Sequence, residues 1–409
     1  MRIAAISYGT EGDIRPMLAL GRELAGRGHS MVLAGDASGA ALAERVGVDF
    51  VPLSGDLRTQ LNGPGELGDI VRRGGQAVSG IKPVRTLLTQ HLHRWTVDLL
   101  RASEGVDVVL SSGLSLPAGF NVAEALDVPV VATFFQPFAA SRHLKSSMLP
   151  PRMPLPLHAP LFRLGNQAAW GMMRATVNSS RAQLGLAPRR ALWRNFRQLG
   201  AWSPTLAAAP PDWGDEIKVV GQWPLATGTD WAPDPALAEF LAAGPAPVYV
   251  GFGSMAVPAD LLRDVVAGLD GRRALVAPGW SAALPGSLPD SVHVVGQVPH
   301  EWLFRRVDAV VHHCGAGTTH TAVRAGAVSI PVPITADQPF WADRLFQLGL
   351  GTRPIPPRRV TPDEIRRALD QVDALRPGVS RAAEQVASED GCAAAVRSLE
   401  QLAERRLAG

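Results

Sequence analysis

The sequence predicts a parallel α/β protein made of two doubly wound halves. Short apolar runs alternate with segments of helical period along most of its 409 residues, which is the pattern of strands joined by crossover helices. A stretch rich in proline, alanine and tryptophan, residues 204–235, separates two such series and is typical of a linker. We therefore expect one domain at 1–215, a second at 216–385, and a carboxy-terminal helix at 386–409.

In the first half, two pairs of strands each flank a helix. The first strands are expected at 3–7 and 30–34, and the next at about 107–110 and 129–133, around a helix near 116–125. The helix between the first two strands is indicated by apolar and small residues at the spacing of one helical face, namely Met17, Leu20, Gly21, Leu24 and Ala25.

Between Pro137 and Pro160 the pattern breaks. This stretch holds six prolines and no clear period, so it is expected to be a long loop, and long loops in compact domains are usually functional. After the linker the alternation resumes, and we expect five strands, near 247–251, 273–277, 292–295, 307–312 and 328–334.

Composition excludes several classes of protein. Hydrophobic residues make up 46% and charged residues 19%, with a net charge of +3, which suits a folded protein and not a disordered one. The two cysteines cannot form a disulfide framework or a cysteine zinc site, and no metal or cofactor is expected. The first residues predict a strand and not a signal peptide. No run approaches the roughly 18 apolar residues of a membrane span. A cytoplasmic protein is therefore expected. There is no dense basic stripe for nucleic acid, but the scattered arginines leave a peripheral membrane contact open.

The strongest chemical signal is a glycine-rich turn that follows the strand ending at about 312. Gly315 and Gly317 allow a ligand to approach the backbone, and the helix expected from His320 to Ala325 would point its first amides and dipole at an anion. The hydroxyls of Thr318 and Thr319 and the imidazole of His313 add hydrogen-bonding groups at the same point. The alternatives are helix capping for the threonines and a half-buried, internally hydrogen-bonded side chain for His313. The pattern predicts a phosphate site, although the turn has no Walker lysine.

At these residues the sequence resembles a known family, the GT-B, family 1 nucleotide-sugar glycosyltransferases. The opening segment is similar to that of the sterol glucosyltransferases and the vancomycin-group antibiotic-tailoring transferases. The motifs occur in family order over nearly the whole chain: Gly9 to Pro16, Val248 to Met255, Gln297 to His300, His313 to Thr319, and Pro333 to Trp341.

The resemblance implies two Rossmann-like domains that face each other across a cleft, and an inverting transfer of a sugar from a UDP- or dTDP-sugar to a hydroxyl of a small, apolar acceptor. It implies no metal, and a carboxy-terminal helix that crosses back onto the first domain. Asp13 would be the general base. The donor site would comprise Gly253, Ser254, His313, Gly315, Gly317 and Thr318 at the diphosphate, Asp337 and Gln338 at the sugar, and Trp280 and Val298 at the nucleobase.

Other positions are less specific. Phe138, Met148 and Trp170 are candidates for an apolar acceptor pocket, with core packing as the alternative for each. Plant members carry a ribose-binding glutamate where this chain has Thr321, so the choice between uracil and thymine stays open. The acceptor, the sugar, the linkage and the oligomeric state are open too.

Asp13 has an alternative role as a helix cap. If Pro16 takes the first helical position, which proline favours, Asp13 lies outside the helix. If Asp13 is the cap, Pro16 has no backbone N–H to donate to the carboxylate of Asp13. Both arrangements leave the carboxylate with few capping partners, which favours a chemical role.

Two other functions remain open. An NAD(P)-dependent oxidoreductase would use Gly9 and Gly12 after the first strand and Asp36 after the second, but the third glycine of that motif is missing. A catalytically silent, transferase-like binding partner would keep the fold without the reaction, and the presence of Asp13 and His313 argues against it.

Overall fold

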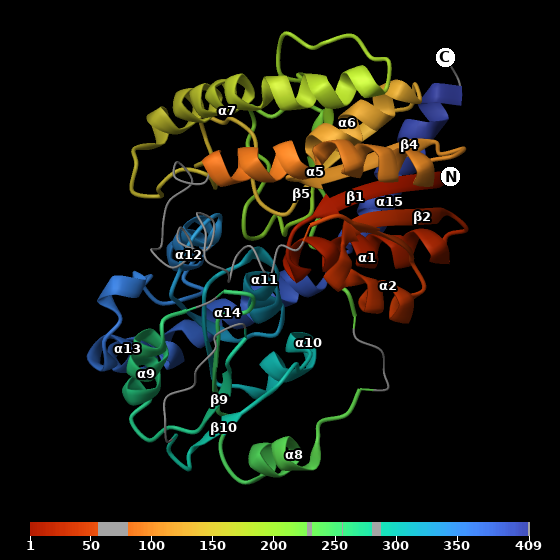
Figure 1. The fold of residues 1–409 in the computed structure, drawn as a ribbon. Helices are drawn as coiled ribbons and strands as arrows, with labels where there is room; N and C mark the ends of the chain where they lie inside the picture. Colours follow the sequence, from red (N-terminus) through yellow and green to blue (C-terminus); the bar gives the residue numbers. More distant parts are fainter. Residues whose placement is uncertain (56–80, 227–230, 256, 280–287, 408–409) are drawn as a thin grey trace. The chain divides into compact units, whose positions relative to one another are not determined.

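The computed structural model describes residues 1–55, 81–226, 231–255, 257–279 and 288–407, which form two compact units (Figure 1). Unit 1 contains the described residues up to Leu225 and those from Asp390 onward, and unit 2 contains those within Ala226–Glu389. The described residues of unit 1 therefore come from both sides of unit 2 in the chain.

Unit 1 is a seven-stranded parallel sheet in the order β3-β2-β1-β4-β5-β6-β7. The strand order reverses between β1 and β4, and ligands of such sheets bind outside the carboxyl ends of the strands at this switch point. The strands are β1 (Arg2–Tyr8), β2 (Ser30–Asp36), β3 (Asp49–Leu53), β4 (Val108–Gly113), β5 (Val130–Phe134), β6 (Arg197–Gly200) and β7 (Ile217–Val219).

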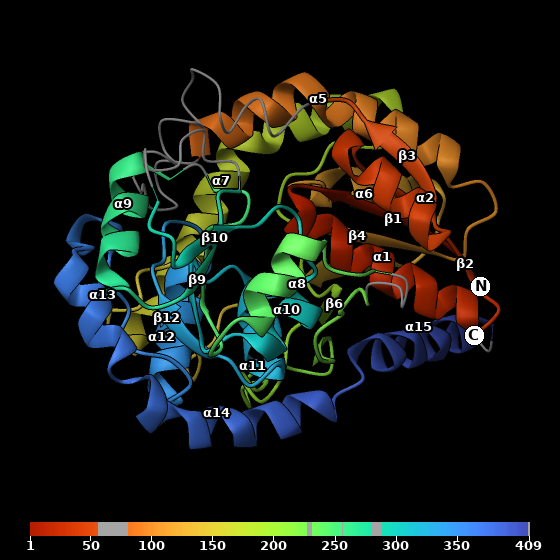
Figure 2. The same cartoon turned by 90° about the horizontal axis from the view of Figure 1, so that it is seen from below.

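Helices cover both faces of this sheet (Figures 1 and 2). On one face lie α5 (Ile81–Ala102), α6 (Leu116–Ala125) and α7 (Leu155–Gln183), and on the other α1 (Glu11–Gly26), η1 (Ala37–Gly39), α2 (Ala40–Val46) and α15 (Gly391–Leu407). The carboxy-terminal helix α15 packs against α1. Beside α1, His29 Nε2 lies 3.0 Å from Glu400 Oε1 of α15.

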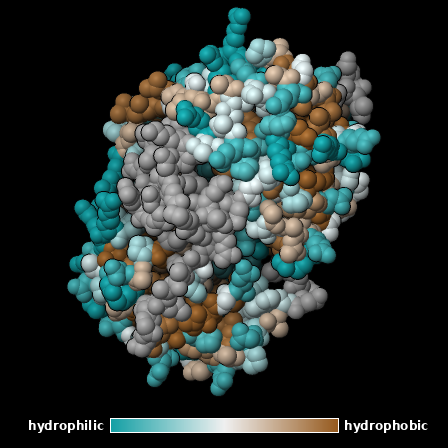
Figure 3. Space-filling model, in the orientation of Figure 1, coloured by the Kyte–Doolittle hydropathy of each residue, from teal (hydrophilic) through white to brown (hydrophobic). Residues whose placement is uncertain are grey.

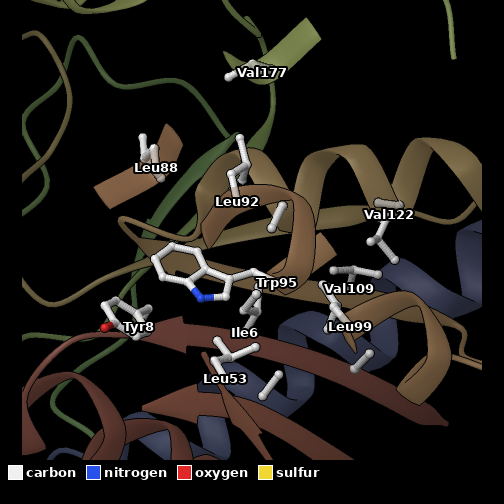
Figure 4. Close-up of a cluster of buried hydrophobic side chains, with 14 of the residues drawn as sticks. Ile6, Tyr8, Leu53, Leu88, Leu92, Trp95, Leu99, Val109, Val122 and Val177 are labelled. Carbon is white, nitrogen blue, oxygen red and sulfur yellow. The ribbon is translucent and has the colours of Figure 1, made fainter. Parts of the chain in front are cut away.

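The core of unit 1 is centred on Trp95 of α5, whose side chain is fully buried against the sheet (Figure 4). Its ring centroid lies 4.2 Å from that of Tyr8, at the end of β1. Its indole Nε1 donates a 2.7 Å hydrogen bond to the carbonyl of Ser54, just after β3. A single aromatic side chain thus fixes α5 over the carboxyl ends of two strands.

Unit 2 is a five-stranded parallel sheet in the order β10-β9-β8-β11-β12, with its switch point between β8 and β11. Its strands are β8 (Val248–Gly251), β9 (Ala274–Ala277), β10 (Val292–Val294), β11 (Ala309–His312) and β12 (Val328–Pro331). Its helices are α8 (Pro235–Ala242), α9 (Ala259–Gly268), α10 (His300–Leu303), η3 (Phe304–Arg306), α11 (Ala316–Arg324), α12 (Gln338–Gln347), η4 (Pro357–Arg359), α13 (Pro362–Leu369) and α14 (Val372–Ala387).

The predicted α/β class with two parallel sheets is confirmed, and each predicted strand is present with ends shifted by at most three residues. The linker prediction was too long, because β7 lies within residues 204–235 and pairs with β6. The predicted loop from Pro137 to Pro160 was also too long. Helix α7 begins at Leu155 and accommodates Pro160 inside it.

Among the described helices, none combines the length and the apolar character that crossing a bilayer requires.

Candidate functional site

The turn between β11 and α11 lies at the switch point of unit 2. Gly315 is the N-cap residue of α11 and has extended backbone angles, φ −59° and ψ 146°. The first backbone hydrogen bond of the helix runs from the amide of Thr319 to the carbonyl of Gly315, at 3.0 Å. The helix therefore begins four residues earlier than predicted, and no described carbonyl accepts from the amides of Ala316, Gly317 and Thr318.

The space beside Gly317 is open. A Cβ added at this exposed glycine would meet no heavy atom within 4 Å. Unpaired first-turn amides and the positive end of a helix dipole together attract anions. The turn can therefore receive a phosphate group against its backbone.

The ring of His313 lies between Gly315 of this turn and Gly253 of the loop after β8. A Cβ at Gly315 would lie 2.6 Å from His313 Nε2, and a Cβ at Gly253 would lie 3.0 Å from His313 Cε1. Gly253 has a φ of +57°, in the region that favours glycine. The position of the His313 ring thus requires glycine at both places. Through this ring the loop after β8, which includes the half-buried Ser254, lies beside the α11 turn.

His313 offers this turn a neutral imidazole with an unpartnered ring nitrogen. Burial, with a smaller contribution from His300, lowers the pKa of His313 to about 4, so the ring is neutral at pH 7. Its Nδ1 is buried and has no hydrogen-bond partner among the described residues. A buried polar atom without a partner is costly and uncommon. Its neighbour His312 is fully buried, as expected of a core residue, and accepts a 3.2 Å hydrogen bond from the amide of Cys314.

Asp337 and Gln338 begin α12, but their side chains already have partners. Asp337 Oδ2 accepts a 2.9 Å hydrogen bond from Trp341 Nε1. Gln338 is 5% exposed, and its Oε1 accepts from the amides of Ile334 and Thr335, both at 2.9 Å. Its carboxamide holds the loop before α12, so the predicted contact of Gln338 with a sugar competes with this structural role.

Asp13 lies at the switch point of unit 1, in the first turn of α1. Thr10 is the N-cap residue, and Asp13, at the third helical position, completes a capping box. Asp13 Oδ2 accepts a 2.8 Å hydrogen bond from the amide of Thr10. Both predicted arrangements of this helix start were wrong. The helix begins at Glu11, and Pro16 lies inside it.

The carboxyl of Asp13 is held in a defined environment. Burial raises its pKa to about 6, and the hydrogen bonds from Thr10 offset only part of this rise. Its backbone carbonyl accepts from Ser7 Oγ at 3.1 Å, and Ser7 Oγ in turn accepts from Ser112 Oγ at 2.7 Å. These hydroxyls tie the first turn of α1 to β1 and β4. An aspartate with this pKa is a better proton acceptor near neutral pH than an ordinary one.

Of the three predicted acceptor residues, one lies in the core of unit 1 and two are half-buried. Trp170 is 5% exposed, belongs to the core of unit 1, and donates from Nε1 to the carbonyl of Arg190 at 3.3 Å. Phe138 is half-buried and stacks on Phe134 with ring centroids 4.8 Å apart. Met148 is half-buried in the loop before α7. For Trp170, core packing is what the structure shows.

The two predicted base-binding residues stay predictions. Val298 is half-buried and packs against the core of unit 2. Trp280 lies outside the described residues.

Sequence reasoning assigned no role to His300, at the first position of α10. Tyr249 Oη lies 3.1 Å from His300 Nε2, and the His300 ring stacks on Phe304 with centroids 4.5 Å apart. His300 also lowers the pKa of His313, so it lies close to the turn that precedes α11. Its place in the segment from Gln297 to His300 was the signal that could have indicated it.

No group of three or more histidine, cysteine, aspartate or glutamate residues in the described part of the chain could hold a metal ion.

Comparison with known proteins finds a family match in each half of the chain. Residues 3–144 match the family model for the glycosyltransferase family 28 N-terminal domain, and residues 260–402 match the erythromycin biosynthesis protein CIII-like C-terminal domain. The chain is 33% identical over 427 residues to the O-mycaminosyltylonolide 6-deoxyallosyltransferase of Streptomyces fradiae, a match that covers 99% of this chain and 98% of that enzyme.

A second relative is longer than this chain. The sterol 3-beta-glucosyltransferase of Emericella nidulans is 32% identical over 432 residues, covering 98% of this chain and 30% of that protein. The chain thus spans less than a third of the length of this fungal relative, and 65% of the length of a sterol 3-beta-glucosyltransferase of Arabidopsis thaliana.

Solved structures agree in fold. The calicheamicin glycosyltransferase CalG4 has a TM-score of 0.70 at 19% identity, covering 100% of this chain and 99% of that chain. The glycosyltransferase VinC in complex with dTDP has a TM-score of 0.67 at 20% identity, covering 99% and 100%. Together with the full-length relative, these findings show that the chain belongs to the GT-B glycosyltransferases, in the group that contains the sterol glucosyltransferases and the antibiotic-tailoring glycosyltransferases.

Proposed function

We propose that this chain transfers a sugar from a UDP- or dTDP-sugar to a hydroxyl of a small, largely apolar acceptor, with inversion at the anomeric carbon. The observation that carries the proposal is the open first turn of α11 beside the unpartnered Nδ1 of His313. This combination suits a diphosphate, because it offers backbone amides, a helix dipole and an imidazole to one anion.

In the proposed reaction the acceptor oxygen forms a bond to the anomeric carbon while the bond from that carbon to the diphosphate oxygen breaks. The acceptor proton passes to the carboxylate of Asp13. The charge that develops on the leaving diphosphate is stabilised by the α11 turn and by His313. Because this charge grows during the reaction, groups fixed in advance around it lower the barrier.

The raised pKa of Asp13 supports its role as the base. A carboxylate of ordinary pKa is a weak proton acceptor toward an alcohol. A pKa of about 6 reduces the difference between the pKa of Asp13 and that of the alcohol. The hydroxyl becomes more acidic as its bond to the sugar forms, so the proton transfers late. The capping box keeps the carboxylate in place throughout.

An apolar, hydroxylated acceptor is proposed from two observations. The relatives' names specify a sterol and a tylonolide, both largely apolar compounds that carry hydroxyls. In unit 1, Phe138 and Phe162 bring two aromatic rings together, with centroids 5.3 Å apart, beside the loop that precedes α7. This loop is held by Asp212, whose carboxylate accepts from Ser141 Oγ and from the amide of Arg142, both at 2.7 Å.

The proposal is tested by thermal denaturation of the full chain with UDP, dTDP, GDP or NAD. A ligand at a hundred times its Kd stabilises the folded state by about 2.7 kcal/mol. We expect stabilisation by UDP or dTDP and none by NAD, and the His313→Ala variant should lose most of it. Stabilisation by NAD alone, or equal stabilisation of wild type and His313→Ala, contradicts the proposed donor site.

A further inference from the structure

Helix α7 exposes a row of hydrophobic side chains. Of the six large hydrophobic side chains that are exposed among the described residues, three lie on this helix: Leu157 is 47%, Leu164 64% and Met172 36% exposed. Spacings of seven and eight residues, about two helical turns, place them on one side. Ala168 and Ala175 are exposed on the same side. In the space-filling view, hydrophobic surface is visible where Figure 1 draws the first turns of α7 (Figure 3).

The opposite side of the same helix is also hydrophobic. Phe162, Trp170 and Val177 are 7%, 5% and 1% exposed, and Trp170 and Val177 belong to the core of unit 1. A helix on the surface of a globular protein normally carries polar residues on its outer side. The folding of unit 1 therefore does not require the outer hydrophobic row of α7.

Exposed arginines flank this row on one side. Arg163 and Arg174 are exposed, and neither forms an ion pair with any described residue. At 100° per residue they lie at one edge of the row, roughly a quarter turn from Leu164. We call Leu157, Leu164 and Met172 with these two arginines the α7 face.

The surrounding sequence is basic as well. Residues 128–211 contain ten arginines and lysines and no aspartate or glutamate, although the whole chain has 40 basic and 37 acidic residues. Within this stretch, Arg181 and Arg189 pair with Glu124 of α6. The α7 face thus lies in the most one-sidedly positive part of a chain whose net charge is only +3.

We propose that the α7 face docks on an anionic lipid membrane. A hydrophobic row edged by arginines along one helix is the arrangement of helices that lie in the plane of a bilayer surface, with the apolar side chains in the acyl boundary and the cations at the lipid phosphates. Helix α7 has 29 residues and is about 43 Å long, so its row fits an extended flat surface. Three large side chains offer far less than the roughly 800 Å² per partner of a stable protein interface, which disfavours a second copy of the chain.

The proposal goes beyond the transfer reaction and does not depend on it. It connects with the reaction through Phe162, on the inner side of α7, whose ring contacts that of the predicted acceptor residue Phe138. An acceptor dissolved in the membrane would therefore meet unit 1 at the helix that contacts its predicted acceptor residues.

The test is flotation of the full chain with lipid vesicles, without donor or acceptor. We expect binding to phosphatidylcholine vesicles that contain phosphatidylglycerol, weak binding to phosphatidylcholine alone, and release by high salt, because salt screens the arginines. Leu164→Glu should weaken binding about tenfold or more, since the insertion of one leucine contributes on the order of 1.5–3 kcal/mol. Arg163→Glu and Arg174→Glu should each weaken it about fivefold or more, at roughly 1 kcal/mol per arginine near an anionic surface.

Matched controls separate the α7 face from general effects. Phe346→Glu replaces a 48% exposed aromatic of α12, and Arg45→Glu reverses an exposed arginine of α2, so both should leave vesicle binding unchanged. Equal binding to the two kinds of vesicle, or binding to neither, overturns the proposal. Self-association without lipid that Leu164→Glu abolishes overturns it in favour of a second copy. Failure of UDP and dTDP to stabilise the chain would refute the transferase proposal and leave the vesicle result unaffected.

Discussion

Two helices begin at the switch points of the two sheets, and their first turns are occupied differently. At α1 the side chain of Thr10 caps the helix, and the Asp13 carboxylate turns back to the Thr10 amide. At α11 the cap is Gly315, which has no side chain, and no described carbonyl accepts from the first three amides. The positive end of the α1 dipole thus faces the protein's own carboxylate, whereas the first turn of α11 has no such carboxylate, and it is there that we propose the donor diphosphate binds.

The comparison shows that a glycine-rich turn before a helix does not by itself predict a phosphate site. An aspartate at the third helical position converts such a turn into a capping box that holds a carboxylate. The loop at Gly9 to Gly12 and the loop at Gly315 to Gly317 each contain two glycines, and the capping box of Thr10 and Asp13 accounts for the difference between them.

The largest effect is expected from removing the carboxylate of the first turn of α1. Asp13→Asn should lower kcat by about 10²–10⁴-fold, the range of general-base contributions, and leave the stabilisation by UDP or dTDP unchanged, because the proposed donor site lies in unit 2. The matched control is Glu11→Gln, which removes an exposed carboxylate two residues earlier and should leave kcat near wild type. Retention of most of the rate in Asp13→Asn would show that the carboxylate only caps the helix.

A loss on the order of 10²-fold in kcat is expected from His313→Ala, because it removes a donor to the developing charge. Unlike Asp13→Asn, it should also weaken donor binding. The exposed His93 of α5 provides the control variant His93→Ala. If His313→Ala changed kcat and left the donor affinity at the wild-type value, the imidazole would not contact the diphosphate in the ground state.

Two glycines at the start of α1 can be tested directly. In Gly9→Ala the added Cβ would overlap Asp13 Oδ2, so the carboxylate must leave the Thr10 amide, and we expect kcat to fall at least about tenfold. In Gly12→Ala the atom nearest to the added Cβ is Thr10 Oγ1 at 3.4 Å. This is an ordinary contact, so kcat should stay near the wild-type value. Equal rates in the two variants would show that the position of the carboxylate is unimportant.

The two first turns should also differ in their response to pH. Asp13 accepts a proton only when ionised, so with a pKa of about 6 the value of kcat/KM should fall as the pH drops below 6, by about tenfold per unit. His313, with a pKa of about 4, stays neutral across this range and contributes no change. The pH profile from 5 to 8 measures this. A flat profile would contradict the assignment of Asp13 as the base.

The smallest effect concerns the cap itself. Thr10→Ala removes a side-chain cap and should lower the free energy of unfolding by about 1 kcal/mol, as measured by denaturant titration. The amide of Thr10 remains, so Asp13 keeps its stronger hydrogen bond and kcat should change little. A loss of kcat as large as that of Gly9→Ala would mean that the Thr10 hydroxyl positions the base.

The strands could be predicted from the sequence because buried parallel strands are short, continuous apolar runs, as β1, β4 and β11 illustrate. Helix starts were harder. Pro16 suggested a helix that starts near residue 16, but the capping box of Thr10 and Asp13 moves the start to Glu11. Pro160 suggested a loop, but burial of Phe162 and Trp170 outweighs the lost hydrogen bond. Local preference and tertiary packing conflict at both places, and a single sequence shows only the first.

The candidate site, too, could be predicted from the sequence only in part. The glycines and His313 could be named from the sequence, because paired glycines directly after a buried strand indicate a close approach to the backbone. The partners of Gln338 could not be predicted, because its hydrogen bonds to Ile334 and Thr335 depend on how the loop before α12 folds. The contact of His300 with Tyr249 depends on the packing of α10 over β8, which sequence spacing does not reveal.

The return of α15 to α1 has a consequence for how the protein is made. The last helix of unit 1 leaves the ribosome only after all of unit 2 has been synthesised, so the first 225 residues wait with the α15-binding surface of α1 uncovered. The described residues of unit 2, in contrast, follow one another in the chain within Ala226–Glu389, so this part can fold before α15 is made. A fragment that stops at Leu225 should therefore be prone to aggregation, and a separately supplied α15 peptide should rescue it.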